Sequence, residues 1–300
     1  MITGRRDPAR FGATLLYGAT DEWLKSTHIS APVVIAIHGF TSDGNNMSDI
    51  ADAVAGERLA PAVFHYHSYL GFDDASDRLS KLLLQYQEAV AEHGIVLVGH
   101  SMGGLVARHL AVHAPEWLRS KIHGLVLLGA PNAGTIKNDW LIDLLLNQAE
   151  RRTSASPWSR SPRCRAARQL TSSDDEGAIA DLNGRCRAAP PTVPILSMSG
   201  ARAQIDGIPR RIVKQLPVPN DGLVAEESAD ITRVITTPTL YRHYNSYPAW
   251  TMTNHTDLPH TQEVVSYLVS WIRREALLFA HDRITVAPEI ALQPSPERPA

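Results

Sequence analysis

Between Ile95 and Arg108, an aliphatic run leads into a sharp turn and then into an apolar helical run. The turn has the pattern G-x-S-x-G, with Ser101 at its tip. A strand-to-helix elbow presents a serine hydroxyl clear of the sheet, where a base can take its proton. Glycines let strand and helix approach closely and let the serine backbone adopt a strained conformation. We therefore predict a nucleophile elbow at Ser101; the alternative is a glycine-rich core turn.

The residues from 95 to 108, I-V-L-V-G-H-S-M-G-G-L-V-A-R, carry a resemblance to a known family. They resemble the α/β-hydrolase fold, and within it the lipase and esterase branch that includes bacterial triacylglycerol lipases and GPI inositol-deacylase-like serine esterases. The similarity runs from about Pro32 to Trp271, with a gap in the middle. The resemblance implies a mostly parallel central sheet with helices on both faces, a lid-like insertion and an acyl-enzyme mechanism.

The order of the predicted elements agrees with an α/β fold. Strands are predicted at residues 13–17, 32–37, 62–66, 95–98, 124–129, 194–200 and 248–253, and helices at 49–59, 75–93, after Ser101 and at 261–278. Strands that alternate with amphipathic helices are typical of a parallel sheet with crossover helices. We expect a single domain over residues 1–284, with an insertion at about 132–190 and a proline-rich disordered tail at 285–300.

The composition excludes several classes of protein. The 29 basic and 31 acidic residues nearly cancel, so no overall charge argues for nucleic-acid binding. No signal-peptide core follows the first residues and no apolar run is long enough to span a membrane, so the expected location is cytoplasmic. Cys164 and Cys186, the only cysteines, are expected to be free thiols. No metal-ligand spacing is present, and no metal or organic cofactor is expected.

Two backbone groups are predicted to stabilise a developing oxyanion. The N–H of Met102 is left free at the start of the helix that follows Ser101. His38-Gly39, which follows a predicted buried strand, is similar to the oxyanion loop of the family. The resemblance implies that the N–H of Phe40 is the second donor; the alternative is an ordinary strand-to-helix turn.

The acid and the base of the site are assigned with the help of the resemblance. Asp221, in the run N-D-G-L-V, is similar to the Asp-Gly-x-Val turn that supplies the acid in lipases, and Asp206 or a purely structural turn are the alternatives. His255 has the family's position before the last helix and its His-x-x-Leu pattern, with His260 or a solvated loop histidine as alternatives. The chain order Ser101, Asp221, His255 is the one described for this fold.

The insertion contains the candidate substrate-binding residues. Residues 140–146 form a strongly apolar predicted helix, and six arginines without an acidic residue follow between Arg151 and Arg168. As a lid, this helix would cover an acyl groove with Trp140, Leu141 and Leu145, and the arginines would allow transient contact with an anionic membrane surface. The alternative is a solvated loop beside an ordinary core helix.

The sequence therefore predicts a serine hydrolase of carboxylic esters, with lipid or other acyl esters as the leading substrates. The same three residues would also serve a thioesterase or an acyltransferase, and a non-catalytic binding protein on this scaffold is the alternative from another class. The oligomeric state is left open.

Overall fold

A computed structural model describes residues 14–16, 32–57, 59–135, 165–170, 177–204, 219–235, 241–245 and 253–279 of the chain. Their strands form one sheet in the order β1-β3-β2-β4-β5-β6-β7. These strands are β1 (Thr14–Leu16), β2 (Val33–Ile37), β3 (Ala60–His65), β4 (Ile95–His100), β5 (Ile122–Leu128), β6 (Ile195–Ser199) and β7 (Tyr241–Asn245). Every described neighbouring pair is parallel except β1 with β3.

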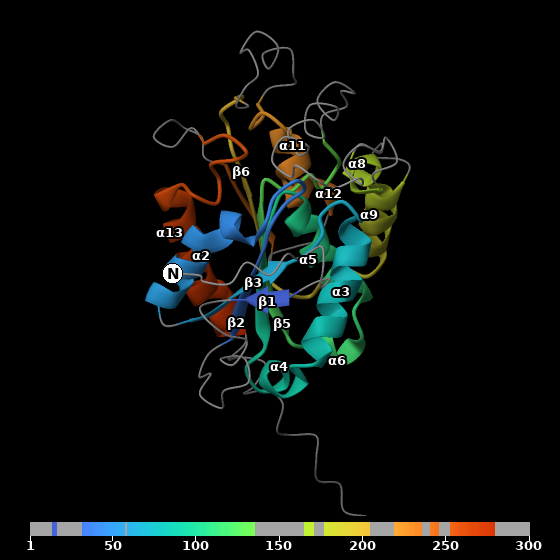
Figure 1. The fold of residues 1–300 in the computed structure, drawn as a ribbon. Helices are drawn as coiled ribbons and strands as arrows, with labels where there is room; N and C mark the ends of the chain where they lie inside the picture. Colours follow the sequence, from blue (N-terminus) through green and yellow to red (C-terminus); the bar gives the residue numbers. More distant parts are fainter. Residues whose placement is uncertain are drawn as a thin grey trace, which may run out of the picture.

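Helices cover both faces of the sheet. The longer ones are α2 (Ser48–Gly56), α3 (Phe72–Leu84), α5 (Met102–His113), α9 (Ala178–Ala188) and α13 (Gln262–Trp271), which continues into the π-helical turn η3 (Ile272–Ala276). The shorter ones are η2 (Gly44–Met47), α4 (Gln87–His93), α6 (Glu116–Arg119), α8 (Arg165–Leu170), α11 (Glu226–Ala229) and α12 (Ile231–Val234). In Figure 1, α2 and α13 lie on one side of the sheet and α3, α5 and α9 on the other. This arrangement confirms the predicted fold class.

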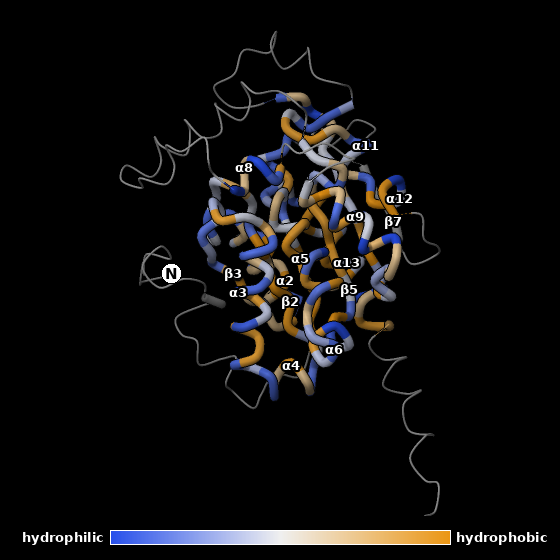
Figure 2. Tube along the Cα trace, turned by 90° about the vertical axis from the view of Figure 1, so that its right-hand side faces the viewer, coloured by the Kyte–Doolittle hydropathy of each residue, from blue (hydrophilic) through white to orange (hydrophobic). Residues whose placement is uncertain are grey.

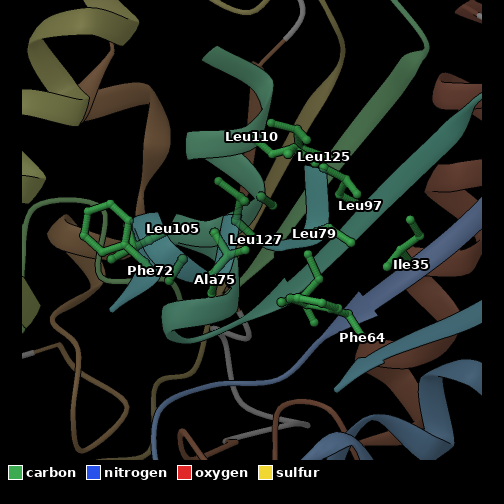
Figure 3. Packing of buried hydrophobic residues seen from close by; sticks show 14 of the residues in the cluster. Ile35, Phe64, Phe72, Ala75, Leu79, Leu97, Leu105, Leu110, Leu125 and Leu127 are labelled. Carbon is green, nitrogen blue, oxygen red and sulfur yellow. The ribbon is translucent and has the colours of Figure 1, made fainter. Parts of the chain in front are cut away.

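The sheet separates two hydrophobic cores, because successive side chains of a strand point to opposite faces. In β4, Ile95 and Leu97 belong to the core under α3 and α5, whereas Val96 and Val98 belong to the core under α2 and α13. Figure 3 shows Leu97 in the first core beside side chains of α3 and α5. The apolar strands run through the middle of the molecule in Figure 2, as expected for strands buried on both faces.

One predicted helix proved to be two, and one strand was missed. The predicted single helix at 75–93 consists of α3 and α4, because N–H groups at Gln85 and Tyr86 bond to the third residue before them and tighten the chain between the helices. The last described strand is β7, which the sequence analysis missed. It carries the polar run Y-R-H-Y-N, which lacks the apolar signal of the other strands. Thr253, placed in a strand by prediction, lies outside any strand.

Several predictions fall on parts of the chain outside the described residues. These are the proposed acyl-groove residues Trp140, Leu141 and Leu145, the alternative acid Asp206, Cys164 and the tail at 285–300. Cys186 is buried, with a free thiol. Thr135 donates from its N–H and its hydroxyl to the carbonyl of Leu170, both at 2.9 Å. These two hydrogen bonds connect the loop after β5 to the end of α8. No helix in the described ranges is long and apolar enough to cross a membrane.

Candidate active site

Ser101 occupies the turn between β4 and α5 in a strained backbone conformation. Its φ of 54° and ψ of −125° lie in a region that residues with a side chain rarely adopt. Thr41 is the only other non-glycine residue with positive φ in the described ranges. Such strain persists only where the surrounding structure enforces it, and it clusters at functional sites. The predicted elbow at Ser101 is therefore present as a backbone conformation.

Close packing around the elbow explains the glycines of G-x-S-x-G. A Cβ atom added to Gly99 would lie 2.3 Å from the backbone of Gly103, and one added to Gly103 would lie 2.2 Å from the carbonyl oxygen of Ile37. Backbone atoms cannot move aside as a flexible side chain could. The turn that presents Ser101 is thus open only to glycine at these two positions.

The loop after β2 approaches Ser101 closely. A Cβ added to Gly39 would lie 2.8 Å from the Cβ of Ser101, which places the backbone of Gly39 beside the serine. Within the described part of the chain, the N–H groups of Phe40 and Met102 have no hydrogen-bond partner. Unpaired backbone donors next to a serine are the groups that an oxyanion would need.

Tyr66, which follows β3, holds this loop in place. Its hydroxyl donates to the carbonyl of His38 at 2.7 Å, and its ring stacks on the His38 ring with 4.3 Å between centroids. The Nδ1–H of His38 donates to the carbonyl of Gly39 at 3.0 Å, because a carbonyl oxygen can only accept. Burial lowers the pKa of His38 to about 4, so the imidazole is neutral near pH 7 and adds no charge behind the loop.

Asp221 and His255 form a buried hydrogen-bonded pair. The Nδ1 of His255 lies 2.8 Å from the Oδ2 of Asp221, and the N–H of His255 donates to the carbonyl of Asp221 at 2.9 Å. The second carboxylate oxygen, Oδ1, accepts from the N–H groups of Leu223 and Val224 at 3.0 and 2.8 Å. Because every oxygen of this carboxylate has a donor, Asp221 is held in one orientation towards the imidazole.

The alternative base, His260, is bound elsewhere. It is exposed, and its ring nitrogens lie 2.9 Å from the Oδ2 of Asp49 and 3.0 Å from the Oδ1 of Asn46, on the side of α2. His255, in contrast, is 4% exposed and contacts His100, the residue directly before Ser101. The structure thus brings Asp221 and His255 together beside the elbow and leaves His260 outside the pair. Their catalytic roles stay predictions.

Two glycines that the sequence analysis did not single out make room for Asp221 and His255. A Cβ at Gly129, which has a φ of 55°, would lie 3.1 Å from both the Oδ2 of Asp221 and the Nδ1 of His255. A Cβ at Gly200 would lie 2.8 Å from the Cβ of Asp221. Each glycine directly follows a buried strand. This position was the only feature of the sequence that could have indicated a role at the site.

A buried cation joins the elbow helix to its surroundings. Arg108 of α5 is fully buried, and its guanidinium donates to the Oδ1 of Asn132 at 3.1 Å and to the Oδ1 of Asn183 at 2.7 Å. Asn183 lies on α9, so this network fixes α9 and the loop after β5 to α5. Among the described residues, no group of His, Cys, Asp and Glu side chains could hold a metal ion.

Comparisons with known proteins place the chain by its fold. Residues 73–173 match the family model described as PGAP1-like alpha/beta domain. The lipase BlEst2 of Bacillus licheniformis is similar in its propeptide form, with a TM-score of 0.58, 16% identity, and coverage of 80% of this chain and 50% of that one. Its mature form has a TM-score of 0.56 and 14% identity, and the match covers 86% of this chain and 97% of that one.

A bromoperoxidase from Bacillus anthracis is also similar, with a TM-score of 0.54, 16% identity, and coverage of 85% of this chain and 94% of that chain. No functionally curated protein matches the sequence. Neighbours with different activities at this identity show the fold and not the reaction. The strand order, the elbow at Ser101 and these similarities together establish that the chain is an α/β-hydrolase-fold protein with a PGAP1-like alpha/beta domain match over residues 73–173.

Proposed function

We propose that the protein is a serine esterase that cleaves carboxylic esters with Ser101 as the nucleophile, His255 as the base and Asp221 as the acid that orients the base. The observation that carries this proposal is the buried 2.8 Å hydrogen bond between His255 and Asp221, on a loop that contacts the elbow of Ser101. A purely structural aspartate and histidine would not require a strained serine next to them.

The proposed reaction has two halves. The Nε2 of His255 removes the hydroxyl proton of Ser101 while the seryl oxygen attacks the ester carbonyl, and the negative charge moves to the carbonyl oxygen between the N–H groups of Phe40 and Met102. The imidazolium then protonates the leaving alcohol as the C–O ester bond breaks. Water repeats the sequence on the acyl-enzyme, which releases the carboxylic acid and restores the serine. Asp221 keeps the proton of His255 on Nδ1 throughout.

The proposed substrates are lipid or other acyl esters. The support is the resemblance to lipases and the apolar run at residues 140–146, with Trp140, Leu141 and Leu145 proposed to line an acyl groove. The arginines from 151 to 168 support transient contact of this insertion with anionic lipid.

Three rates measured with the purified chain test this function. They are the hydrolysis of p-nitrophenyl butyrate, the hydrolysis of the corresponding p-nitrophenyl thioester, and the cleavage of the ester in the presence of an acceptor alcohol. The proposal expects ester hydrolysis to be the fastest reaction. Faster thioester cleavage would indicate a thioesterase, and accumulation of the transferred ester would indicate an acyltransferase. No reaction with any of them would favour a binding protein on a hydrolase scaffold.

A further inference from the structure

His100 lies at the junction between the nucleophile elbow and the loop that carries His255. It is the last residue of β4 and directly precedes Ser101. Val96 and Val98 face the core under α2 and α13, and the alternation of a strand places His100 on this same face. The loop of residues 253–261 runs into α13 on that face. The elbow and the histidine loop therefore meet at the side chain of His100.

The contact between the two histidines is specific. The Nε2 of His100 lies 2.8 Å from the carbonyl oxygen of His255, and the two rings are 4.9 Å apart between centroids at 41°. Because a carbonyl oxygen only accepts, Nε2 carries the hydrogen. The Nδ1 of His100 is then an acceptor, and it is buried without a partner in the described structure.

The unpaired Nδ1 of His100 makes this side chain costly to bury. An apolar residue would fill the same space without leaving a buried acceptor unsatisfied, and would therefore be less costly. The property that such a residue lacks is the Nε2–H donor. The hydrogen bond to His255 is thus the feature of His100 that packing alone does not explain.

The backbone of His255 is held from two sides. Its N–H donates to the carbonyl of Asp221 at 2.9 Å, and its C=O accepts from His100. The first hydrogen bond comes from Asp221, the proposed acid, and the second from His100, the residue before the proposed nucleophile. The side chain of His255 then has little freedom, since its Nδ1 is also bound to Asp221.

His100 can hold this position without adding charge. Burial lowers its pKa to about 3, and the positive charges that His255, His260 and His38 would carry when protonated lower it further. The imidazole is therefore neutral at any pH at which an esterase of this kind would work. It places no positive charge against His255 when that residue receives the serine proton.

We propose that His100 is a positioning residue, which fixes the backbone of His255 so that its imidazole stays aligned between Asp221 and Ser101. This assignment rests on the proposed esterase function. Loss of the hydrogen bond from His100 to His255 would slow the proton transfers and leave ester binding nearly unchanged, because binding of the ground state does not require an aligned base.

The test compares His100→Leu, His100→Gln, His100→Asn and the control His123→Leu, which removes a buried histidine at the start of the neighbouring strand β5, far from the strand end that carries His100. The kcat and KM for p-nitrophenyl butyrate, the rate of fluorophosphonate labelling and the melting temperature are measured for each. His100→Leu should lower kcat by about 10- to 100-fold, the scale expected for a misplaced catalytic group, with KM changed by less than about threefold. Labelling should slow in parallel.

The two amide variants keep the test decisive even if the leucine variant fails to fold. The glutamine nitrogen reaches the place of Nε2, so His100→Gln should recover most of kcat, whereas the shorter asparagine should not. His123→Leu should lower the melting temperature without lowering kcat. Equal kcat for the glutamine and asparagine variants, or an equal loss in His123→Leu, would overturn the assignment. A wild-type chain that neither hydrolyses the ester nor reacts with the probe would instead overturn the esterase function and this role with it.

Discussion

The Nδ1 of His255 lies 2.8 Å from the Oδ2 of Asp221, and both side chains are buried, at 4% and 0% exposure. Because a carboxylate is an acceptor, this contact keeps the hydrogen of the imidazole on Nδ1 and leaves Nε2 with a lone pair. Two backbone N–H groups hold the other carboxylate oxygen, so the carboxylate cannot rotate away. A base with a defined tautomer is what activation of Ser101 requires.

Replacement of Asp221 by asparagine tests the role of this tautomer. The amide keeps the shape of the side chain but presents an N–H to His255, so kcat should fall by about three to four orders of magnitude without loss of the fold. Steady-state kinetics and circular dichroism would be compared with those of Asp206→Asn, which should be nearly silent. A large loss in Asp206→Asn with a small one in Asp221→Asn would move the acid to residue 206.

Gly129 offers a test of how closely Asp221 and His255 are packed. A Cβ in Gly129→Ala would lie 3.1 Å from the hydrogen-bonded atoms of both residues, at a φ of 55° that costs about 1 to 2 kcal/mol for a residue with a side chain. We expect a lower melting temperature and a kcat reduced by about 100-fold, because the base is displaced.

Gly184 of α9 is the matched control, because an added Cβ there meets nothing within 4 Å. Gly184→Ala should raise the free energy of unfolding by about 0.5 to 1 kcal/mol through better helix propensity, with unchanged kcat. An unchanged kcat in Gly129→Ala, as expected for the control, would mean that the close packing at Asp221 and His255 does not affect catalysis.

The buried histidines predict the pH dependence of stability. Burial lowers the pKa of His38 to about 4 and that of His100 to about 3, from an ordinary value of 6.5 that they regain on unfolding. Below pH 6.5 the unfolded state binds more protons than the folded state. The free energy of unfolding should therefore be highest above pH 6.5 and decrease as the pH falls from 6.5 towards the pKa values of the folded state. Each histidine contributes a slope of about 1.4 kcal/mol per pH unit in that window.

Urea unfolding at pH 7, 6 and 5 measures this slope. The His100→Gln variant lacks one of these groups and should lose less stability between pH 6 and pH 5 than the wild type. Identical pH dependence in the two proteins would mean that His100 is not held neutral by burial.

The proposed acyl groove is tested by a series of p-nitrophenyl esters of increasing chain length. If Leu141 and Leu145 line the groove, each added methylene should improve transition-state binding by up to about 0.8 kcal/mol, so kcat/KM should climb before it levels off. Replacement of both leucines by serine should flatten the climb and leave acetate esters unaffected. A flat profile in the wild type would contradict the acyl groove and would favour a hydrolase of small esters.

The parts of the site that the sequence could predict are those with a strong local signature. The elbow at Ser101 combines an aliphatic run with glycines whose packing leaves no room for a Cβ, and both signals lie within a few residues. Asp221 and His255 were assigned through short patterns and chain order, because they lie 34 positions apart and no residue between them carries a trace of their hydrogen bond.

Other features depended on contacts that no local pattern reveals. The hydrogen bond from His100 to the carbonyl of His255 spans 155 positions in the sequence, and the hydroxyl of Tyr66 reaches the carbonyl of His38 across 28. The strand β7 was missed because its residues alternate without an apolar face. Tertiary pairing, rather than local preference, sets the strand there.

Reaction of the purified chain with a fluorophosphonate probe, followed by mass spectrometry of the labelled peptide, tests whether Ser101 is the nucleophile. The account predicts a single adduct on Ser101 and complete loss of labelling and of ester hydrolysis in Ser101→Ala, which keeps the melting temperature of the wild type. His255→Ala should lose nearly as much activity, because the members of such a site act as a unit. An adduct on another residue, or a Ser101→Ala variant that retains most of its hydrolysis, would contradict the assignment of Ser101 as the nucleophile.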